Sequence, residues 1–283
     1  MLPRVTLTFM SSASSHVKAS ASRAADSKPL EYLARGGFVC YGIIHLLFAW
    51  LILQVAFGHS AAEGDQNGAL QSLAGNSFGK FLLIVIAVGM VGLAIWQAFE
   101  AIVGESGPQD KAAIAERVVS AVRTVVYLWL ASIAVKIVTG ANSSSAASSQ
   151  SKSSHLMTST GGRWLVGLVG LVVLGVGIGL LVYGVTKKFE KHLNSRQMRP
   201  SVRKSTRRLG MAGYSAKGVA YAIAGVLVVV AAVTYDPDKA RGLDSALKAL
   251  AGHAYGGWLL GLIALGVAAF GIFCFFQAKY RKV

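Results

Sequence analysis

The sequence predicts an all-α membrane protein with six transmembrane helices, which form three parallel two-helix repeats in a pseudo-threefold arrangement. Three observations predict this fold. Of the 283 residues, 54% are hydrophobic and only 14% are charged, against about 25% charged in soluble domains. Six segments are apolar over the length of a membrane span, and the sequence resembles itself three times. This composition excludes a disordered chain and argues against a soluble globular protein.

The spans follow from the stretches between charged residues. A span needs about 20 mostly apolar residues, because the hydrocarbon core is about 30 Å thick and a helix rises about 1.5 Å per residue. Five stretches free of charge qualify, at 36–62, 81–99, 164–186, 218–235 and 249–278. The helices predicted from them are 36–57, 79–103, 164–186, 210–234 and 257–278. A sixth, 118–139, contains Arg123 and Lys136 toward its ends, where long basic side chains can reach the interface. All six are predicted to be helices, because lipid leaves backbone groups no partner outside their own segment.

Two polar segments flank these spans. Residues 1–32 are rich in Ser and Ala with scattered basic residues, which predicts a disordered cytoplasmic tail. A transit peptide is the alternative interpretation of this segment. Residues 190–208 are predicted to form a basic cytoplasmic linker.

An internal repeat organises the chain. When 69–101 is aligned with 246–278 without gaps, 14 of 33 positions are identical. The middle third is more diverged, but GRWLVGLVGL at 162–171 still matches GGWLLGLIAL at 256–265. The predicted units are 33–104, 116–189 and 209–280. Since each unit contains two spans, all three have the same orientation, as parallel repeats do.

The basic residues predict the orientation. With both termini in the cytoplasm, 21 of the 28 Lys and Arg residues lie on the inner side and 7 on the outer side. Under the positive-inside rule this ratio favours a multi-pass protein of the bacterial cytoplasmic (inner) membrane with both termini cytoplasmic. The net charge of +16 is then mainly a signal of topology.

The outer loops of the first and third units share a short amphipathic pattern, ALQSLAG and ALKALAG. Each predicts a short interfacial helix that is capped at its start by Asn67 or Asp244 and ended by Gly75 or Gly252. Within the spans, the pairs Gly175/Gly179 and Gly257/Gly261 are predicted to let neighbouring helices approach closely.

These motifs resemble a known family. The unit starts are GFVCYGIIH at 37–45 and GYSAKGVAY at 213–221, and the unit centres are ALQSLAGNSFG at 69–79 and ALKALAGHAYG at 246–256. They are similar to the tandem two-helix repeats of the bacterial membrane family of domain of unknown function 1206, although the second unit lacks the ALxxLAG centre. The family has no assigned activity, so the resemblance implies architecture and location but no reaction.

No motif predicts catalysis or a cofactor. Nucleotide-binding loops, nucleophile elbows and metal-ligand spacings are absent from the sequence. Cys40 and Cys274 lie in apolar runs and are predicted to be small core residues. We therefore expect no cofactor, no metal site and no catalytic residues.

The basic segment 187–217 predicts a partner. It carries 10 Lys and Arg residues directly beside two spans, and anionic lipid headgroups attract such segments by about 1 kcal/mol per basic residue. Nucleic-acid binding is the alternative, but aromatic residues are not interleaved with the basic ones, so no nucleic acid is expected.

Polar residues inside the spans are the candidate functional residues, because they are costly in lipid. On the first helices they align in two layers one turn apart, and Glu100 near the end of a second helix is expected to pair with Arg123 or Lys217. The candidates are Tyr41, Arg123 and Lys217 in one layer, His45, Tyr127 and Tyr221 in the next, and Glu100.

Two interpretations of these residues stay open. They pack and anchor the helices, or they line a polar path. The first interpretation favours a non-enzymatic membrane protein in envelope organisation or a membrane partner of another protein. The second favours a small channel or transporter for protons, ions or a small solute. A protein partner is not identified by the sequence.

Overall fold

The computed structural model describes residues 27–58, 66–103, 111–140, 151–156, 159–236 and 243–282. Within these ranges nearly every residue is helical, and the one extended pairing is an antiparallel bridge between Leu193 and Arg281. The prediction of an all-α fold is confirmed.

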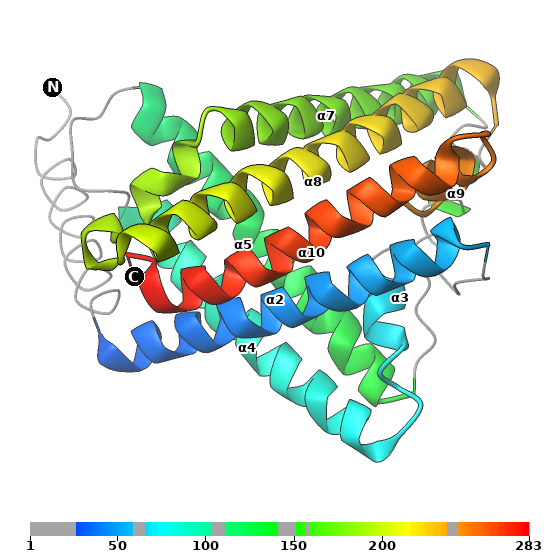
Figure 1. Ribbon diagram of the computed structural model, residues 1–283. Coiled ribbons are helices and arrows are strands. Elements are labelled where there is room, and N and C mark those ends of the chain that lie inside the picture. Colours follow the sequence, from blue (N-terminus) through cyan, green and yellow to red (C-terminus); the bar gives the residue numbers. More distant parts are fainter. Residues whose placement is uncertain are drawn as a thin grey trace, which may run out of the picture.

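Six helices are long and apolar enough to cross a membrane, and they cover all six predicted spans, including the one that contains Arg123 and Lys136. They run alternately in opposite directions (Figure 1). One end of the bundle, which we call the basic end, holds the starts of the first helices and the ends of the second helices. The six are α2 (Lys28–Ala56), α4 (Ser77–Val103), α5 (Lys111–Val138), α7 (Thr160–Val185), α8 (Pro200–Thr234) and α10 (Gly256–Tyr280).

Three of these helices begin well before their predicted spans: α5 begins at Lys111 instead of residue 118, and α2 and α8 begin inside predicted polar segments. Residues 28–32 of the expected disordered tail belong to α2, whereas 1–26 lie outside the described residues. Helix α8 begins at Pro200, inside the expected linker 190–208. Both helices have a proline in the first turn, where its fixed φ suits a helix. A search for spans of membrane length does not detect the parts of a helix that extend beyond the lipid. The 35 residues of α8 extend about 50 Å, whereas the hydrocarbon core is about 30 Å thick.

The two predicted short helices are present at the opposite end. They are α3 (Gln66–Gln71) and α9 (Leu243–Ala251). Asn67 and Asp244 lie in the first turn of these helices, one residue after the helix start, and both are buried. Helix α9 ends at Ala251, directly before Gly252, as predicted, whereas α3 ends at Gln71, four residues before Gly75. Neither glycine has a positive φ, so neither forms a left-handed cap.

The helices pack in a regular order. The first helix of each unit packs extensively against the second helix of the preceding unit, which gives the pairs α2/α10, α5/α4 and α8/α7. Within units, α2 packs against α4 and α8 against α10. Figure 1 shows α7, α8, α10 and α2 side by side, with α4 and α5 behind them. In the described part of the chain, α5 and α7 make no comparable contact. The threefold arrangement itself stays a prediction.

Glycines at seven-residue spacing permit the closest of these contacts. On α7 they are Gly170, Gly177 and Gly184, and a Cβ atom added at Gly177 would lie 2.4 Å from the backbone nitrogen of Ala222 in α8. Gly175 and Gly179 have nothing within 4 Å of an added Cβ, and neither has Gly261. The prediction of close packing at Gly175 and Gly179 is therefore wrong, because the face of α7 that meets α8 carries Gly177.

Valines explain the separation of α5 from α7. In the first unit, a Cβ added at Gly37 of α2 would lie 2.5 Å from Cγ of Leu93 in α4. The aligned residues of the second unit are Val119 and Val176, which are 45% and 49% exposed. Without the glycine, the second unit does not repeat the close approach of Leu93 to Gly37, in agreement with the lack of a comparable contact between α5 and α7.

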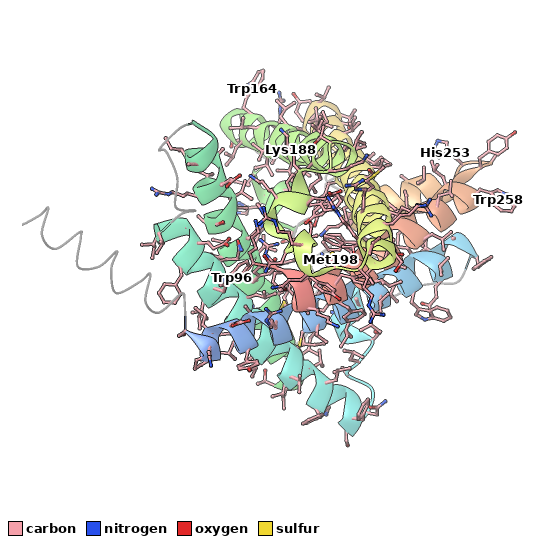
Figure 2. All side chains as sticks on the ribbon, turned by 60° about the vertical axis from the view of Figure 1, so that its left-hand side comes forward. Trp96, Trp164, Lys188, Met198, His253 and Trp258 are labelled. Carbon is pink, nitrogen blue, oxygen red and sulfur yellow. The ribbon has the colours of Figure 1, made fainter. Side chains whose placement is uncertain are left out.

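The outer surface is apolar, as a lipid-facing surface must be. Aligned aromatic residues stand exposed at the starts of the second helices, with exposed fractions of 62% for Phe81, 76% for Trp164 and 83% for Trp258. Trp164 and Trp258 project outward from the bundle in Figure 2. Aromatic side chains at this position are typical of a membrane interface.

Candidate polar site between the repeats and at the basic end

A buried lysine joins the third unit to the first. The Nζ atom of Lys217 in α8 lies 3.2 Å from the hydroxyl oxygen of Tyr41 and 3.1 Å from Nε2 of His45, both in α2. His45 is fully buried and Lys217 is 8% exposed. Neither partner is a carboxylate, so the ammonium charge is held by neutral acceptors.

The hydrogen bonds assign the protonation of His45. Its Nδ1 lies 2.8 Å from the backbone carbonyl oxygen of Tyr41. Because a carbonyl oxygen can only accept, Nδ1 carries a proton and donates it. Nε2 of the neutral ring is then free of a proton and accepts a hydrogen bond from Lys217. The contacts thus fit a neutral histidine and a charged lysine.

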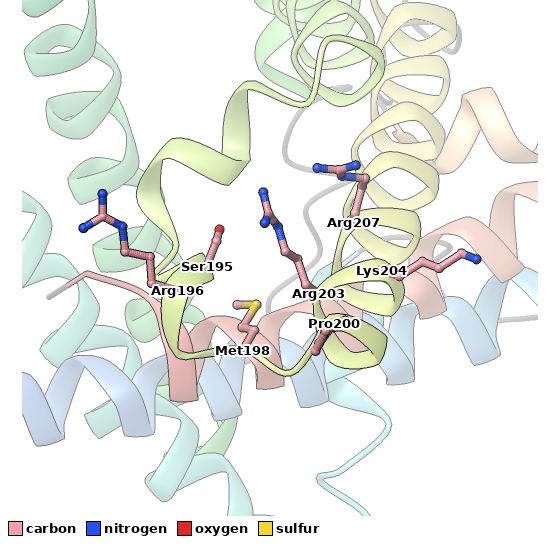
Figure 3. Close-up of a pocket in the computed structure, with 7 residues that line it drawn as sticks. All are labelled: Ser195, Arg196, Met198, Pro200, Arg203, Lys204 and Arg207. Carbon is pink, nitrogen blue, oxygen red and sulfur yellow. The ribbon is translucent and has the colours of Figure 1, made fainter.

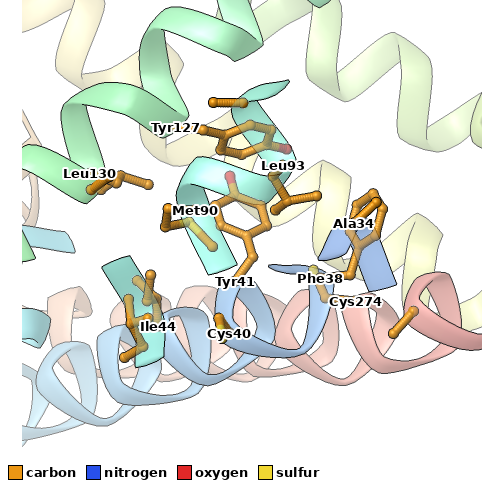
Figure 4. Packing of buried hydrophobic residues seen from close by; sticks show 14 of the residues in the cluster. Ala34, Phe38, Cys40, Tyr41, Ile44, Met90, Leu93, Tyr127, Leu130 and Cys274 are labelled. Atoms are coloured by element: carbon orange, nitrogen blue, oxygen red, sulfur yellow. The ribbon is translucent and has the colours of Figure 1, made fainter. Parts of the chain in front are cut away.

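Aromatic rings enclose this group. Lys217 Nζ lies 4.0 Å from the centroid of the Phe270 ring in α10, a distance at which a cation is attracted by the ring face. The ring of Tyr127 in α5 meets the ring of Tyr41 edge-on at 5.2 Å, and the close-up shows the two tyrosines facing each other (Figure 4). The first helices of all three units therefore contribute to one buried cluster.

The structure thus brings together four of the predicted residues, namely Tyr41, His45, Tyr127 and Lys217. Tyr221 follows Lys217 by one turn of α8 and is half-buried. Arg123 and Glu100 lie nearer the basic end. Whether any of these residues has a role beyond packing stays a prediction.

The expected ion pair between Glu100 and Arg123 is not formed. The Glu100 carboxylate accepts hydrogen bonds from Nε2 of Gln97 at 3.2 Å and from the hydroxyl of Ser120 at 3.5 Å. Ser120 stands one turn before Arg123 in α5, so Arg123 is still within electrostatic range of the carboxylate. Neutral donors on α4 and α5 occupy the positions that the prediction gave to a basic partner.

An ordered cap closes the basic end. It consists of the 3₁₀ helices η1 (Lys188–His192) and η2 (Ser195–Gln197), which connect α7 to α8. The Phe189 side chain is 1% exposed and its ring contacts the rings of Tyr214 and Phe273. The backbone of the cap also pairs with the end of α10, since Asn194 N donates to Tyr280 O at 2.8 Å and Lys282 N donates to His192 O at 3.0 Å.

Ion pairs fasten this cap to the helices. Arg207 of α8 donates two hydrogen bonds to the Glu190 carboxylate, at 2.5 and 2.9 Å. Lys191 pairs with Glu116 of α5. The Arg207 guanidinium holds the pKa of Glu190 below its ordinary value. Burial lowers the pKa of His192 to about 2, with further lowering by the charges of Arg281, Arg123, Lys191 and Lys282.

These pKa values predict that the cap loosens in acid. A released His192 binds a proton below about pH 6.5, whereas docked His192 stays neutral, so docking weakens by about 1.4 kcal/mol per pH unit below that value. Glu190 adds to the loss at lower pH, because its depressed pKa contributes stability only while the group is ionised. Hydrogen exchange of the amides of 188–197 should therefore accelerate from pH 6.5 to pH 5, after correction for the intrinsic exchange rate. His192→Gln should remove most of this acceleration, and an unchanged pH dependence in that variant would contradict the assignment.

An open pocket lies between η2 and the start of α8 (Figure 3). Its volume is about 670 Å³. Four basic side chains line it, together with Ser195, Met198 and Pro200; the basic residues are Arg196, Arg203, Lys204 and Arg207. We call it the basic pocket. Since Pro200 begins α8, the pocket also faces the positive end of a helix dipole.

Several buried residues of the bundle were not among the predicted site residues. Arg281 and Gln97 are buried, as is Gln277, and Phe270 contacts Lys217. Cys40 and Cys274 are free and buried, in agreement with their predicted place in the core. Across the described ranges, no three His, Cys, Asp or Glu side chains come close enough together to hold a metal ion.

Comparison with known proteins decides the family. Three stretches of the chain, 36–104, 118–187 and 212–281, each match Domain of Unknown Function (DUF1206). The chain belongs to the DUF1206 family. Each match covers one unit with its two long helices, so the three predicted repeats are three copies of the DUF1206 domain.

A relative has the same extent. The chain is 29% identical over 260 residues to a protein of Bacillus subtilis (strain 168) named Uncharacterized protein YxxB, and the match covers 91% of this chain and 94% of that protein. No solved structure matches the chain. The DUF1206 protein described here thus resembles a bacterial relative over most of the length of both chains.

Proposed function

We propose that this DUF1206 protein is a non-enzymatic, multi-pass protein of the bacterial cytoplasmic membrane, in envelope organisation or as the membrane partner of another protein. In this proposal the basic end faces the cytoplasm and rests on anionic lipid headgroups. The basic pocket is the observation that supports it most strongly. Four basic side chains line it, and Arg203 and Arg207 extend over it in Figure 3, beside the starts and ends of the spans, where headgroup phosphates of the inner leaflet would lie.

Lipid binding at this pocket can be measured in nanodiscs. The double variant Arg203→Gln/Lys204→Gln removes two pocket charges, both on exposed side chains. Each charge contributes about 1 kcal/mol near an anionic surface, so affinity for phosphatidylglycerol should fall about 30-fold. Arg208→Gln is the matched control, because Arg208 is exposed on the same helix but does not line the pocket. Equal phosphatidylglycerol affinity in wild type and the double variant would exclude the pocket as a headgroup site.

The proposed orientation, with the basic end in the cytoplasm, can be tested separately. A reporter that is active only in the periplasm should work when it is inserted in the segment 140–161, and should fail when it is fused after Val283. The reason is that the C-terminus lies at the basic end with most of the Lys and Arg residues. An active fusion at the C-terminus would reverse the assignment. A fusion at 190–205 tests the same side, although it also displaces the cap.

A second candidate function is supported by the Lys217 cluster. Charged residues inside membrane proteins often belong to ion or proton pathways, and here Lys217 contacts both His45 and Tyr41. Reconstituted vesicles would show proton or ion flux that is lost in His45→Ala. The absence of flux in both proteins would remove this candidate and leave the cluster a structural role.

A further inference from the structure

Two arginine side chains at the basic end of the bundle form no ion pair with an acidic side chain among the residues that the structure describes. Arg281 follows the last turn of α10 and is 5% exposed. Its guanidinium lies 5.1 Å from the ring centroid of Phe38 and 4.7 Å from that of Trp96. Its Nε atom is buried and has no hydrogen-bond partner. The aromatic rings therefore stabilise the charge of Arg281, but its Nε–H group still lacks a hydrogen-bond acceptor.

Arg123 of α5 is the second arginine, and its side chain is half-buried. Among the described residues it donates no hydrogen bond and forms no ion pair. Its charge interacts electrostatically with the hydroxyls of Tyr214, Tyr127 and Tyr183, which come from three different helices. The Glu100 carboxylate lies in range, but it accepts hydrogen bonds from Gln97 and Ser120.

The two guanidinium groups lie at the same level of the basic end. Arg281 lies over the ring of Phe38, about one turn before Tyr41 in α2, and Arg123 stands one turn before Tyr127 in α5, whose ring meets that of Tyr41. Both guanidinium groups interact electrostatically with the hydroxyls of Tyr127 and Tyr214 and with the ring of His192 in the cap. The two ring nitrogens of His192 are buried and have no partner. The region thus collects two cations, tyrosine hydroxyls and a neutral imidazole, all able to donate a hydrogen bond, beneath the cap.

We propose that Arg123 and Arg281 bind a phosphoryl group at the basic end, inside the bundle and separate from the basic pocket. An unpaired charge removed from water is destabilising, whereas a paired and hydrogen-bonded one is tolerated. Guanidinium groups match phosphate oxygens with parallel hydrogen bonds, and two guanidinium charges suit a dianion. The phosphoryl group belongs to inorganic phosphate or to the headgroup of a phospholipid, since both present the same oxygens. This site goes beyond the proposed function and does not depend on it.

The test uses the full chain and two probes. Thermal unfolding is followed in detergent with inorganic phosphate against chloride at equal ionic strength, and in nanodiscs with phosphatidic acid against phosphatidylcholine. Arg123→Gln and Arg281→Gln remove one guanidinium each, and Arg208→Gln is the surface control. Wild type and Arg208→Gln should unfold at a higher temperature with the probe. Each site variant should need at least about tenfold more probe for the same rise, because one charge-assisted pair is lost.

The outcomes separate the two sources of the phosphoryl group. A response to inorganic phosphate assigns a soluble ligand, and a response in phosphatidic acid alone assigns a lipid headgroup. Without either probe, Arg123→Gln should unfold no lower than wild type, because it loses an unpaired charge. The proposal is overturned if neither probe stabilises the wild type beyond its control, or if the site variants respond as the wild type does. The wild-type titration decides even where a variant fails to fold.

Discussion

Gly177→Leu is expected to separate α7 from α8 and to lower the unfolding temperature strongly. An added Cβ atom at Gly177 would lie 2.4 Å from the backbone nitrogen of Ala222 and 2.8 Å from the carbonyl oxygen of Gly218. Both obstacles are backbone atoms, so no side chain can move aside and the helices must move instead. Overpacking of this kind costs about 3 kcal/mol, which corresponds to roughly 6–12 °C in a chain of this size.

The control for this substitution lies two residues away. Gly179→Leu adds the same side chain to the same helix, but an added Cβ at Gly179 meets nothing within 4 Å. It should leave the unfolding temperature unchanged or raise it slightly, because Gly is about 1 kcal/mol less favourable than Ala in a helix and Leu is nearly as favourable as Ala. Equal destabilisation by both variants would show that the α7/α8 contact has been assigned to the wrong face.

Phe189→Ala is expected to release the cap from the basic end. The Phe189 ring is 1% exposed and lies 5.5 Å from the ring of Tyr214 and 5.2 Å from that of Phe273. Gly210 makes room for it, because a Cβ there would lie 2.5 Å from Phe189 Cε2. Loss of a buried phenylalanine costs about 3–5 kcal/mol. Trypsin should then cut the cap at its many basic residues well below the temperature at which the helices unfold.

Phe78→Ala is the matched control, because Phe78 is 75% exposed at the start of α4. It should leave both the unfolding temperature and the trypsin pattern of the cap unchanged. If Phe189→Ala unfolds like the wild type and its cap resists trypsin, the ion pairs and backbone bonds hold the cap without the aromatic anchor.

The spans were predictable because lipid restricts the choice of structure. A stretch of about 20 uncharged apolar residues can only be a helix there. Arg123 and Lys136 did not break the pattern, since they lie toward the ends of the predicted span 118–139, although Arg123 falls near the middle of the longer helix α5. The ends of the helices were less predictable. The apolar pattern ends at the membrane surface. Helix α8, in contrast, begins beyond that surface at Pro200, and its first turns contain many basic residues, which form helices well.

The contacts between helices were harder to predict, because composition does not show which face of a helix meets its neighbour. Gly175, Gly177 and Gly179 are spaced by two residues and point in different directions, so the familiar four-residue spacing favoured the pair that meets nothing. The valines of the second unit could have predicted the separation of α5 from α7. Val119 takes the place of Gly37, whose missing side chain admits Leu93 in the first unit.

The polar cluster was partly predictable because the repeats align. Tyr41, His45, Tyr127 and Lys217 share one stripe of the first helices, and related helices direct related residues to a common interior. Arg281 could not be found in this way. It lies beyond the last predicted span, and only the fold carries it back over Trp96.

The central claim is that the first and third repeats share one buried polar site. The most direct test is to measure the coupling between Lys217 and His45. The measurement is a double-mutant cycle of unfolding free energy for His45→Ala and Lys217→Met, with exposed His253→Ala in place of His45→Ala as the control cycle. A coupling energy of about 1.5–3 kcal/mol is expected for the first cycle, because each single change leaves a buried partner without its hydrogen bond. The control cycle should be additive. Additive losses for His45 and Lys217 would contradict the shared site.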